Sequence, residues 1–287
     1  MILTLADGRR LGYAEKGDPE GRPVVALHGT PGSRLTTYPY EEHLVDNRIR
    51  LITYDRPGCG DSDRAPGRTV ADAAGDICAL LDHLGIERAA VLGGSGGGPH
   101  ALAMATLAPE RCTLVHCFVG VAPIDADGLD FYAGMDPENV RKFRAAAQGL
   151  AVAEAEIAQD FEAILDRARN EDPDKLLGAL KLPEADLRIL REVGAQVVAA
   201  TLEGGKHGVG GFLDDFVAIA RPWGFDPRQA SAPVLVSYGA HDVNVPPGHG
   251  AWLAANVPNK EVRVKTDGGH LSTPQESLAR LVELAEA

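Results

Sequence analysis

The chain has few cysteines, no run of basic residues and no long apolar segment. None of its cysteines belongs to a C-x-x-C pair, so we expect free thiols. The formal net charge is −13, which disfavours a phosphate-backbone partner, and we expect no binding to nucleic acid. No apolar run could span a bilayer, and the first residues lack a basic region before a long apolar segment, so we expect a cytoplasmic protein with no membrane partner. The cysteines are Cys59, Cys78, Cys112 and Cys117.

Two phosphate-binding motifs are absent from the glycine-rich stretch 93–98. G-x-G-x-x-G would need a glycine where Pro99 stands, and a P-loop would need Lys and Ser or Thr in place of Pro99 and His100. No cluster of His, Cys and carboxylate residues has the spacing of metal ligands. The sequence therefore predicts no cofactor and no metal. It favours a small-molecule substrate as partner and does not indicate an oligomeric state.

The same stretch does match G-x-S-x-G, with Ser95 at its centre. The apolar run 88–92 before it is typical of a buried strand, and the Ala-rich run 99–107 after it is typical of a helix. In a nucleophile elbow, glycines let the backbone take a strained turn between strand and helix, which exposes the serine oxygen above a sheet. We therefore predict that Ser95 is a nucleophile.

The order of segments predicts the fold class. After an opening antiparallel hairpin, strands, loops and helices alternate as far as Ser95, and an apolar fraction of 45% can fill a large core. This alternation predicts an α/β protein with a mostly parallel, doubly wound sheet, helices on both faces and ligands at the carboxyl ends of the strands. Thr69 is expected to cap a helix over 69–84. The expected strands are 2–5, 11–15, 23–27, 50–54, 88–92, 113–119, 234–238 and 262–265.

The alternation is interrupted between the sixth and seventh of these strands. Residues 124–229 contain few strand-like runs and several polar, Ala- and Glu-rich helical ones, such as 138–149 and 152–169. We interpret 124–229 as a helical cap inserted into a core domain made of 1–123 and 230–287. After the seventh strand we expect a helix that ends near Asn256, and after the eighth strand a last helix from Pro274.

A serine hydroxyl becomes a useful nucleophile only when a base takes its proton and an acid holds that base. His270 follows the last expected strand after two glycines, and we predict that it is the base. Asp242 follows the strand 234–238 and is the predicted acid. The chain order Ser95, Asp242, His270 is that of Ser-acid-His hydrolases. Asp125, which follows the preceding strand, is the alternative acid.

With these features the chain resembles the α/β-hydrolase-fold family, with a helical cap after the sixth strand of the fold. The resemblance covers essentially the whole length and implies an oxyanion hole made by the backbone N–H groups of Thr30 and Gly96. The glycines of the loop that contains Thr30 permit close approach, so His28 and Gly29 are candidate substrate contacts. For His28, His241 and His249, packing or local loop structure is the favoured interpretation. The matching segments are 28–32, 55–62, 93–97, 239–242 and 269–270.

Ser95 separates the chain from epoxide hydrolases and haloalkane dehalogenases of this fold, in which the resemblance gives an aspartate nucleophile. Proline iminopeptidases are more similar, because they share a His-Gly-x-Pro-Gly loop and a cap whose acids hold the ammonium group of the substrate. Gly96, however, stands where that branch has a bulky residue. The acids that the cap offers here are Glu203, Asp214 and Asp215.

The sequence therefore favours a cofactor-independent serine hydrolase that acts on a carboxylic ester, a thioester or an activated carbon–carbon bond. The alternatives are a proline-iminopeptidase-like aminopeptidase and a ligand-binding protein without turnover. Because the cap should roof the site, we expect its aromatic residues to shape a pocket for a small to medium apolar acyl group, with Phe212 and Trp223 as candidate contacts. The aromatic residues considered are Phe131, Tyr132, Phe212, Phe216, Trp223 and Phe225.

Overall fold

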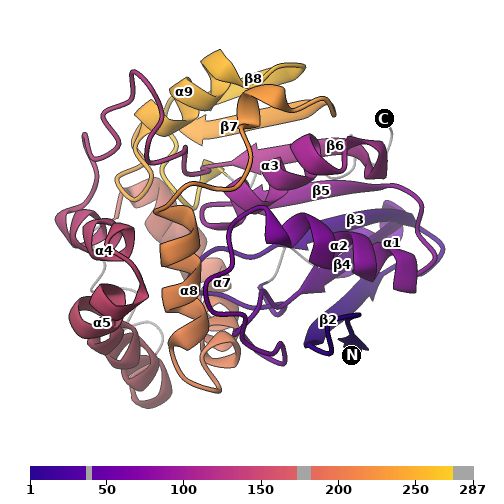
Figure 1. Cartoon of the computed structure of the whole chain (residues 1–287), viewed down its shortest axis with the longest axis horizontal. Coiled ribbons are helices and arrows are strands. Elements are labelled where there is room, and N and C mark those ends of the chain that lie inside the picture. The colour runs from indigo at the N-terminus through magenta and orange to yellow at the C-terminus, as the bar shows by residue number, and fades with distance from the viewer. Residues whose placement is uncertain (37–40, 173–181, 274–287) are drawn as a thin grey trace.

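The computed structural model describes residues 1–36, 41–172 and 182–273, and these form one eight-stranded sheet (Figure 1). The strand order is β1-β2-β4-β3-β5-β6-β7-β8. The first two strands form the expected antiparallel hairpin, β2 pairs antiparallel with β4, and every later pairing is parallel. The strands are β1 (Ile2–Thr4), β2 (Arg10–Gly17), β3 (Arg22–Leu27), β4 (Ile49–Tyr54), β5 (Ala89–Gly94), β6 (Cys112–Phe118), β7 (Val234–Gly239) and β8 (Lys260–Lys265).

The strand alternation explains how this sheet is covered. Along β3, Val25 and Leu27 belong to a large apolar cluster that includes residues of α2 and α3, whereas Val24 and Ala26 belong to a second cluster with Leu44 of α1. Successive side chains of a strand point to opposite faces, so a strand that is apolar at every position has both faces covered. The helices outside the insertion are α1 (Glu41–Asp46), α2 (Asp72–His83), α3 (Gly97–Leu107) and α9 (Pro247–Asn256), with a short 3₁₀ turn at Pro109–Arg111.

Two details of the sequence prediction need comment. Thr69 was expected to cap α2, but the helix begins at Asp72, and the carboxylate of Asp72 accepts hydrogen bonds from the backbone N–H and the hydroxyl of Thr69. As an N-cap, Thr69 would accept a hydrogen bond through its side chain, whereas here Thr69 is the donor and Asp72 the acceptor. The last predicted helix, from Pro274, lies outside the described residues.

Within its described residues, the segment between β6 and β7 contains helices and no strand, as predicted. Its helices are α4 (Pro137–Ala147), α5 (Leu150–Asn170), α7 (Glu184–Gly204) and α8 (Gly210–Ile219), with a 3₁₀ turn at Pro227–Gln229. They lie together on one side of the sheet, on the left in Figure 1. The fold is therefore the α/β-hydrolase type with a helical cap after the sixth strand. The cap limits of 124 and 229 stay a prediction.

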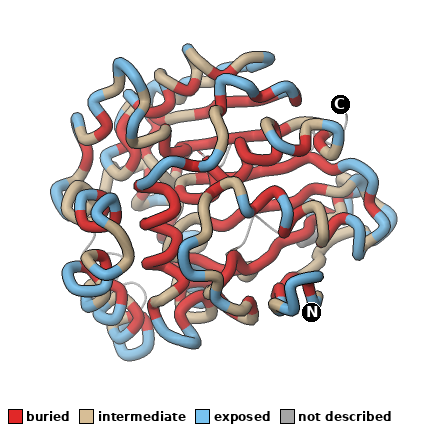
Figure 2. The backbone as a smooth tube through the Cα atoms, viewed as in Figure 1, coloured by how far each residue is buried: buried red, intermediate tan, exposed pale blue. Residues whose placement is uncertain are grey.

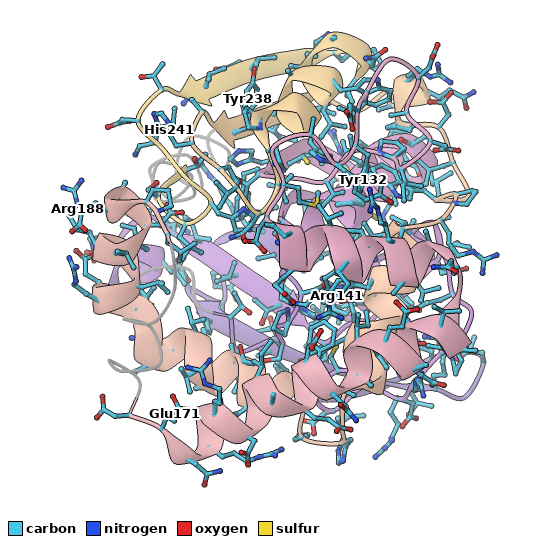
Figure 3. All side chains as sticks on the ribbon, turned by 90° about the vertical axis from the view of Figure 1, so that its left-hand side faces the viewer. Tyr132, Arg141, Glu171, Arg188, Tyr238 and His241 are labelled. Carbon is cyan, nitrogen blue, oxygen red and sulfur yellow. The ribbon has the colours of Figure 1, made fainter. Side chains whose placement is uncertain are left out.

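Within the cap, α8 is the helix most enclosed by its neighbours. Nine of its ten residues are buried, and Figure 2 shows this continuous buried run beside the alternating exposure of α4 and α5. The ring of Phe216 on α8 contacts the rings of Phe143 on α4 and Phe161 on α5, and so joins the three helices. Arg141 of α4 forms an ion pair with Asp160 of α5, and Glu171 and Arg188, labelled in Figure 3, point outward from the cap. No helix among the described residues is long and apolar enough to cross a membrane.

Candidate active site

The turn between β5 and α3 has the geometry of a nucleophile elbow. Ser95 lies at its apex with a φ of +53°, a left-handed conformation that costs a non-glycine residue about 1–3 kcal/mol. The neighbours of Ser95 have no room for side chains. A Cβ on Gly94 would collide with the Phe118 ring, and a Cβ on Gly96 would lie 2.6 Å from the hydroxyl oxygen of Thr30. The glycines directly before and after the serine are thus required by contacts with Phe118 and Thr30.

His270 and Asp242 are hydrogen bonded to each other. The Nδ1 of His270 lies 2.7 Å from Oδ2 of Asp242, whose side chain is 1% exposed. The other carboxylate oxygen of Asp242 accepts from the backbone N–H groups of Asn244 and Val245, each at 2.9 Å. These three hydrogen bonds fix the Asp242 carboxylate. They engage only Nδ1 of the His270 ring, so Nε2 remains available to act on the serine hydroxyl. Asp125, the alternative acid, is an exposed residue.

The pKa of His270 reflects competition between burial and charge. Burial by itself lowers the pKa, but the charge and hydrogen bond of Asp242, with a contribution from the charge of Asp186, raise it above the ordinary value of 6.5. A base with this pKa is largely protonated in mildly acidic solution and becomes available as the pH rises through and beyond neutrality.

Ser95 and His270 line one cavity of about 230 Å³, together with Thr30 and Gly96. Its remaining walls are mainly apolar and come from both the core and the cap. Two of its lining residues, Asn139 of α4 and Asn244, are polar and hydrogen bond to each other at 3.3 Å. Sequence reasoning did not single them out, because an isolated asparagine carries no local signal of a site. The apolar lining residues are Val121, Phe143, Phe216, Ile219 and Val245.

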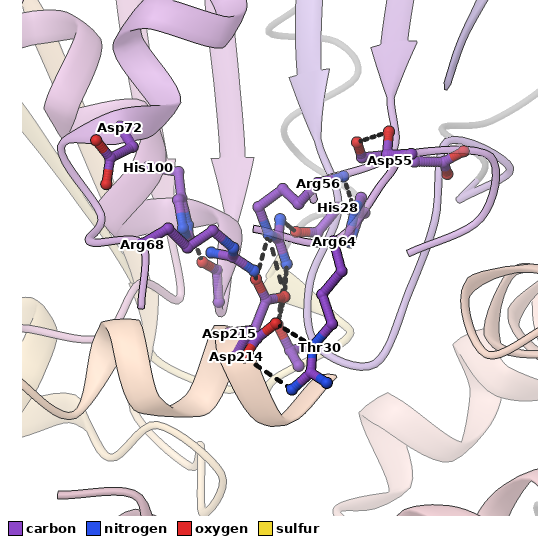
Figure 4. A network of polar contacts seen from close by, with 12 residues as sticks. His28, Thr30, Asp55, Arg56, Arg64, Arg68, Asp72, His100, Asp214 and Asp215 are labelled. Atoms are coloured by element: carbon purple, nitrogen blue, oxygen red, sulfur yellow. Dashed lines mark hydrogen bonds and ion pairs between the residues drawn. The ribbon is translucent and has the colours of Figure 1, made fainter. Parts of the chain in front are cut away.

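Thr30 is held by a buried polar network that reaches into the cap (Figure 4). Its hydroxyl donates to Oδ2 of Asp215 at 2.7 Å and accepts from Nη2 of Arg56 at 2.9 Å. Asp215, on α8, also pairs with Arg56 at 2.5 Å and with Arg68. Burial alone would raise the pKa of Asp215, but the two arginines hold it well below its usual range, so the carboxylate stays charged. The loop next to Ser95 is therefore joined to a cap helix by ionised groups.

His28 belongs to the same buried network, and both nitrogens of its ring contact backbone groups. Its Nε2 accepts from the backbone N–H of Arg56 at 3.1 Å, and its Nδ1 donates to the carbonyl of Gly29 at 2.7 Å. The residue is 2% exposed, and burial, assisted by the charge of Arg56, lowers its pKa to about 3. Gly29 does approach the nucleophile, because a Cβ placed on it would lie 3.6 Å from Cβ of Ser95.

The aromatic residues of the cap divide into two groups. Phe143 and Phe216 line the cavity. Phe212 and Trp223, the candidate contacts, are 0% and 3% exposed and lie outside the cavity lining, because Phe212 packs on Phe161 and Trp223 packs on Phe225. Both rings therefore pack within the cap, and their role as substrate contacts stays a prediction.

Two of the remaining histidines have the local roles that the sequence favours. His249 is buried between the backbone N–H of Ala122 and the carbonyl of Phe131, whereas His241 is exposed. All four cysteines are free, and burial raises the pKa of the Cys59 thiol.

The acids considered as ammonium-binding groups are all paired with cations. Glu203 contacts Arg34 at 2.8 Å and Lys206 at 2.7 Å. Asp214 pairs with Arg64 at 2.6 Å, and Asp215 with the two arginines described above. None of the three acids is among the residues that line the cavity beside Ser95.

Comparison with known proteins agrees with this architecture. A sequence profile of the alpha/beta hydrolase fold matches residues 22–276. The chain belongs to the α/β-hydrolase fold family.

Individual relatives include two proline iminopeptidases and an esterase. The chain is 40% identical over 115 residues to the proline iminopeptidase of Xylella fastidiosa strain 9a5c, which covers 39% of this chain and 36% of the relative. It is 27% identical to the proline iminopeptidase of Neisseria meningitidis serogroup A over 302 aligned positions. This alignment covers 99% of this chain and 94% of the relative. The structure matches a thermophilic esterase from Thermogutta terrifontis at a TM-score of 0.66 and 25% identity, covering 100% and 96%. The chain spans only about a third of the length of three of the proline iminopeptidases that it matches.

Proposed function

We propose that this protein is a hydrolase that cleaves carboxylic esters with small to medium apolar acyl groups. In this proposal Ser95 is the nucleophile, His270 the general base and Asp242 its partner. The observation that carries the proposal is the single cavity in which Ser95 and His270 meet, with His270 bonded to Asp242 and with mainly apolar walls. A pocket of this kind accepts a neutral, apolar acyl group beside a serine.

The reaction would proceed through an acyl-enzyme. The hydroxyl oxygen of Ser95 attacks the ester carbonyl while Nε2 of His270 takes the hydroxyl proton, and the resulting imidazolium donates that proton to the departing alkoxide. Water then gives a proton to His270 and attacks the acyl-serine, which releases the carboxylic acid and returns the proton to Ser95. Asp242 keeps Nδ1 of His270 protonated and stabilises the imidazolium.

We assign the oxyanion hole to the backbone N–H groups of Thr30 and Gly96. The closeness of the two residues supports this assignment, since a Cβ on Gly96 would lie 3.3 Å from the backbone nitrogen of Thr30. Two N–H donors that converge on one point stabilise the negative oxygen of the tetrahedral intermediate. The Thr30 hydroxyl is already engaged by Asp215 and Arg56, so its bonds brace the loop.

An aminopeptidase specific for an amino-terminal proline is the second candidate, because relatives named proline iminopeptidase match the chain. Such a substrate carries a free ammonium group, whose removal from water requires a carboxylate partner. The three acids considered for this role, Glu203, Asp214 and Asp215, are ion-paired with arginine or lysine. Their pairing favours the esterase proposal over the aminopeptidase one.

The test is a p-nitrophenyl ester series of increasing acyl length, measured beside prolyl and alanyl anilides. The proposal expects faster hydrolysis of the esters, and Ser95→Ala should abolish it. Faster cleavage of the anilides, lost on Glu203→Gln or Asp214→Asn, would favour the aminopeptidase.

A fluorophosphonate probe separates both enzymes from a ligand-binding protein. We expect it to label the wild-type chain and not Ser95→Ala, because the probe reacts only with an activated serine. Absence of labelling and of hydrolysis across the panel would favour binding without turnover.

A further inference from the structure

The cap contains a further buried carboxylate, Asp186, in the first turn of α7. It is 0% exposed and begins the buried face of this helix, which continues through Leu190 and Gly194. No lysine or arginine among the described residues forms an ion pair with it, in contrast to Asp215. A buried carboxylate needs hydrogen bonds to offset the loss of hydration, so the partners of Asp186 identify what it holds.

Those partners belong to the loop that carries His270. Oδ2 of Asp186 accepts from the backbone N–H of His270 at 2.7 Å. Oδ1 accepts from the backbone N–H of Ser272 at 2.9 Å and from its hydroxyl at 2.8 Å. The Ser272 hydroxyl in turn accepts from the backbone N–H of Gly269 at 2.8 Å. The loop is therefore folded around the carboxylate, and most of its bonds are made by backbone groups.

Gly269, the residue directly before His270, is explained by this contact. A Cβ on Gly269 would collide with the carboxylate of Asp186, and a Cβ on Gly239, at the end of β7, would lie 2.6 Å from the carbonyl oxygen of Gly269. The loop thus lies between the sheet and a cap helix, with no space for a side chain at 269. Gly269 is needed so that the Asp186 carboxylate can reach the backbone.

We infer that Asp186 is a positioning residue for His270, by which the cap sets the orientation of the base relative to Ser95. This inference rests on the proposed role of His270 as the general base. The ring of His270 is held by Asp242 and its backbone by Asp186, two anchors from different parts of the chain. With only the ring anchored, the imidazole could turn or shift about that bond, and a displacement of about 1 Å can lower a rate roughly 100-fold.

The charge of Asp186 gives the inference a second readout. The charged and titratable groups that act on His270 are Asp242, from the loop after β7, and Asp186, from α7, and both favour the imidazolium. Removal of the Asp186 charge should therefore lower the pKa of His270. A residue that only stabilised the fold would change the melting temperature and leave that pKa and the rate of the folded enzyme as they were.

The experiment compares Asp186→Asn with wild type and with Asp214→Asn, a buried cap acid whose partner is Arg64. Asparagine has nearly the shape of aspartate, but its amide nitrogen is a hydrogen-bond donor at a position where a carboxylate oxygen of Asp186 accepts. We expect Asp186→Asn to reduce kcat about 10- to 100-fold with KM little changed, and to move the rise of kcat/KM to lower pH. Asp214→Asn should keep the wild-type kcat and pH profile. Wild-type kcat and an unshifted profile in folded Asp186→Asn would overturn the inference.

Ser272→Ala is the second variant in case Asp186→Asn does not fold. It removes one bond to Asp186 and keeps the charge, so we expect a smaller fall in kcat without a shift of the pH profile. If Ser272→Ala were fully active where Asp186→Asn could not be made, the positioning role would be wrong.

An NMR titration of the His270 ring, assigned with His270→Asn, needs no substrate. It separates the inference from the proposed function. If wild type hydrolysed no ester and took up no fluorophosphonate, the proposed function would fail, while a lower His270 pKa in Asp186→Asn would still support the positioning contact. Equal pKa values in the two proteins would contradict it.

Discussion

The loops at the carboxyl ends of the strands and the helices of the cap contribute to one cavity in different ways. The loops supply Ser95, His270 and Asp242, each within a few residues of a strand end. The cap supplies buried carboxylates whose partners are distant in sequence: Asp186 is separated by 84 residues from His270, and Asp215 by 185 from Thr30. The local sequence at the strand ends is thus enough to place the reactive groups, whereas the alignment of these groups depends on contacts between segments that are distant in sequence.

The two carboxylates of the cap also differ from each other. Asp215 is ionised between two arginines and contacts Thr30 through its side chain. Asp186 meets chiefly backbone N–H groups around His270. Loss of Asp215 would leave buried arginines without their partner, while loss of Asp186 would release a loop. The following predictions test this contrast between loops and cap, and between the two acids.

The largest effect is expected at the nucleophile. Ser95→Ala should reduce ester hydrolysis by at least about 10³-fold, because the residues of a triad act as a unit and the attacking oxygen is removed. The fold should remain intact, since alanine is small enough for the elbow. Turnover is measured on the best ester of the series and folding by circular dichroism. Near-wild-type turnover of the purified variant would exclude Ser95 as the nucleophile.

The second prediction distinguishes the two candidate acids. Asp242→Asn should lower kcat by about 10²- to 10⁴-fold, because an amide cannot hold His270 in the required tautomer. Asp125→Asn should change kcat only slightly, since Asp125 is exposed. Parallel measurements of kcat for the two variants decide between them, and the opposite ranking would assign the acid to Asp125.

The sequence was sufficient for the sheet and for the loops that meet above it. Each expected strand is present, because apolar runs bounded by glycine and proline are local patterns. The role of Asp186 could not be predicted, because its contact is not local. An acid in the first turn of a helix is ordinarily explained by a favourable interaction with the helix dipole. Nothing near it in sequence indicates a partner in the loop of His270. The burial of Phe212 could not be foreseen either, because a helix pattern does not say which neighbour covers each face.

Asp215 gives the largest expected effect on stability. Asp215→Asn should reduce the free energy of unfolding by about 3–5 kcal/mol at neutral pH, because it leaves Arg56 buried without its counter-charge. Asp214→Asn should cost less, since its partner Arg64 is 36% exposed and can be hydrated. Urea denaturation of both variants measures the difference. Equal losses would show that burial of the arginine partner does not decide the outcome.

The pH dependence of this stability has a defined sign. The pKa of Asp215 is depressed in the folded state, so its contribution is present above the unfolded pKa of about 3.9 and is lost as the pH falls toward the folded value. The difference between wild type and Asp215→Asn should therefore shrink below about pH 4. A difference that stayed constant in acid would contradict ionic stabilisation by Asp215.

Activity should follow the ionisation of His270. The base must be neutral, so kcat/KM should rise about tenfold per pH unit below the pKa of His270 and level off above it. The midpoint should lie above the ordinary value of 6.5, because Asp242 and Asp186 raise this pKa against the effect of burial. A profile of kcat/KM on an activated ester from about pH 5 to 9 gives the midpoint. A flat profile would count against His270 as the base.

The smallest effect concerns the acyl pocket, where a matched pair of phenylalanines is available. Phe216 lines the cavity, whereas Phe161 packs against Phe216 from behind and does not line it. Both belong to the apolar core of the cap, so each substitution by leucine should cost similar stability. Phe216→Leu should raise the ratio of kcat/KM for hexanoate over acetate esters by several-fold, because a methylene in an apolar pocket is worth about 1–3 kcal/mol at most. Phe161→Leu should leave the ratio near the wild-type value. If the two variants changed the ratio equally, the cap would act on acyl selectivity through its overall packing, and Phe216 would not be a wall of the acyl site.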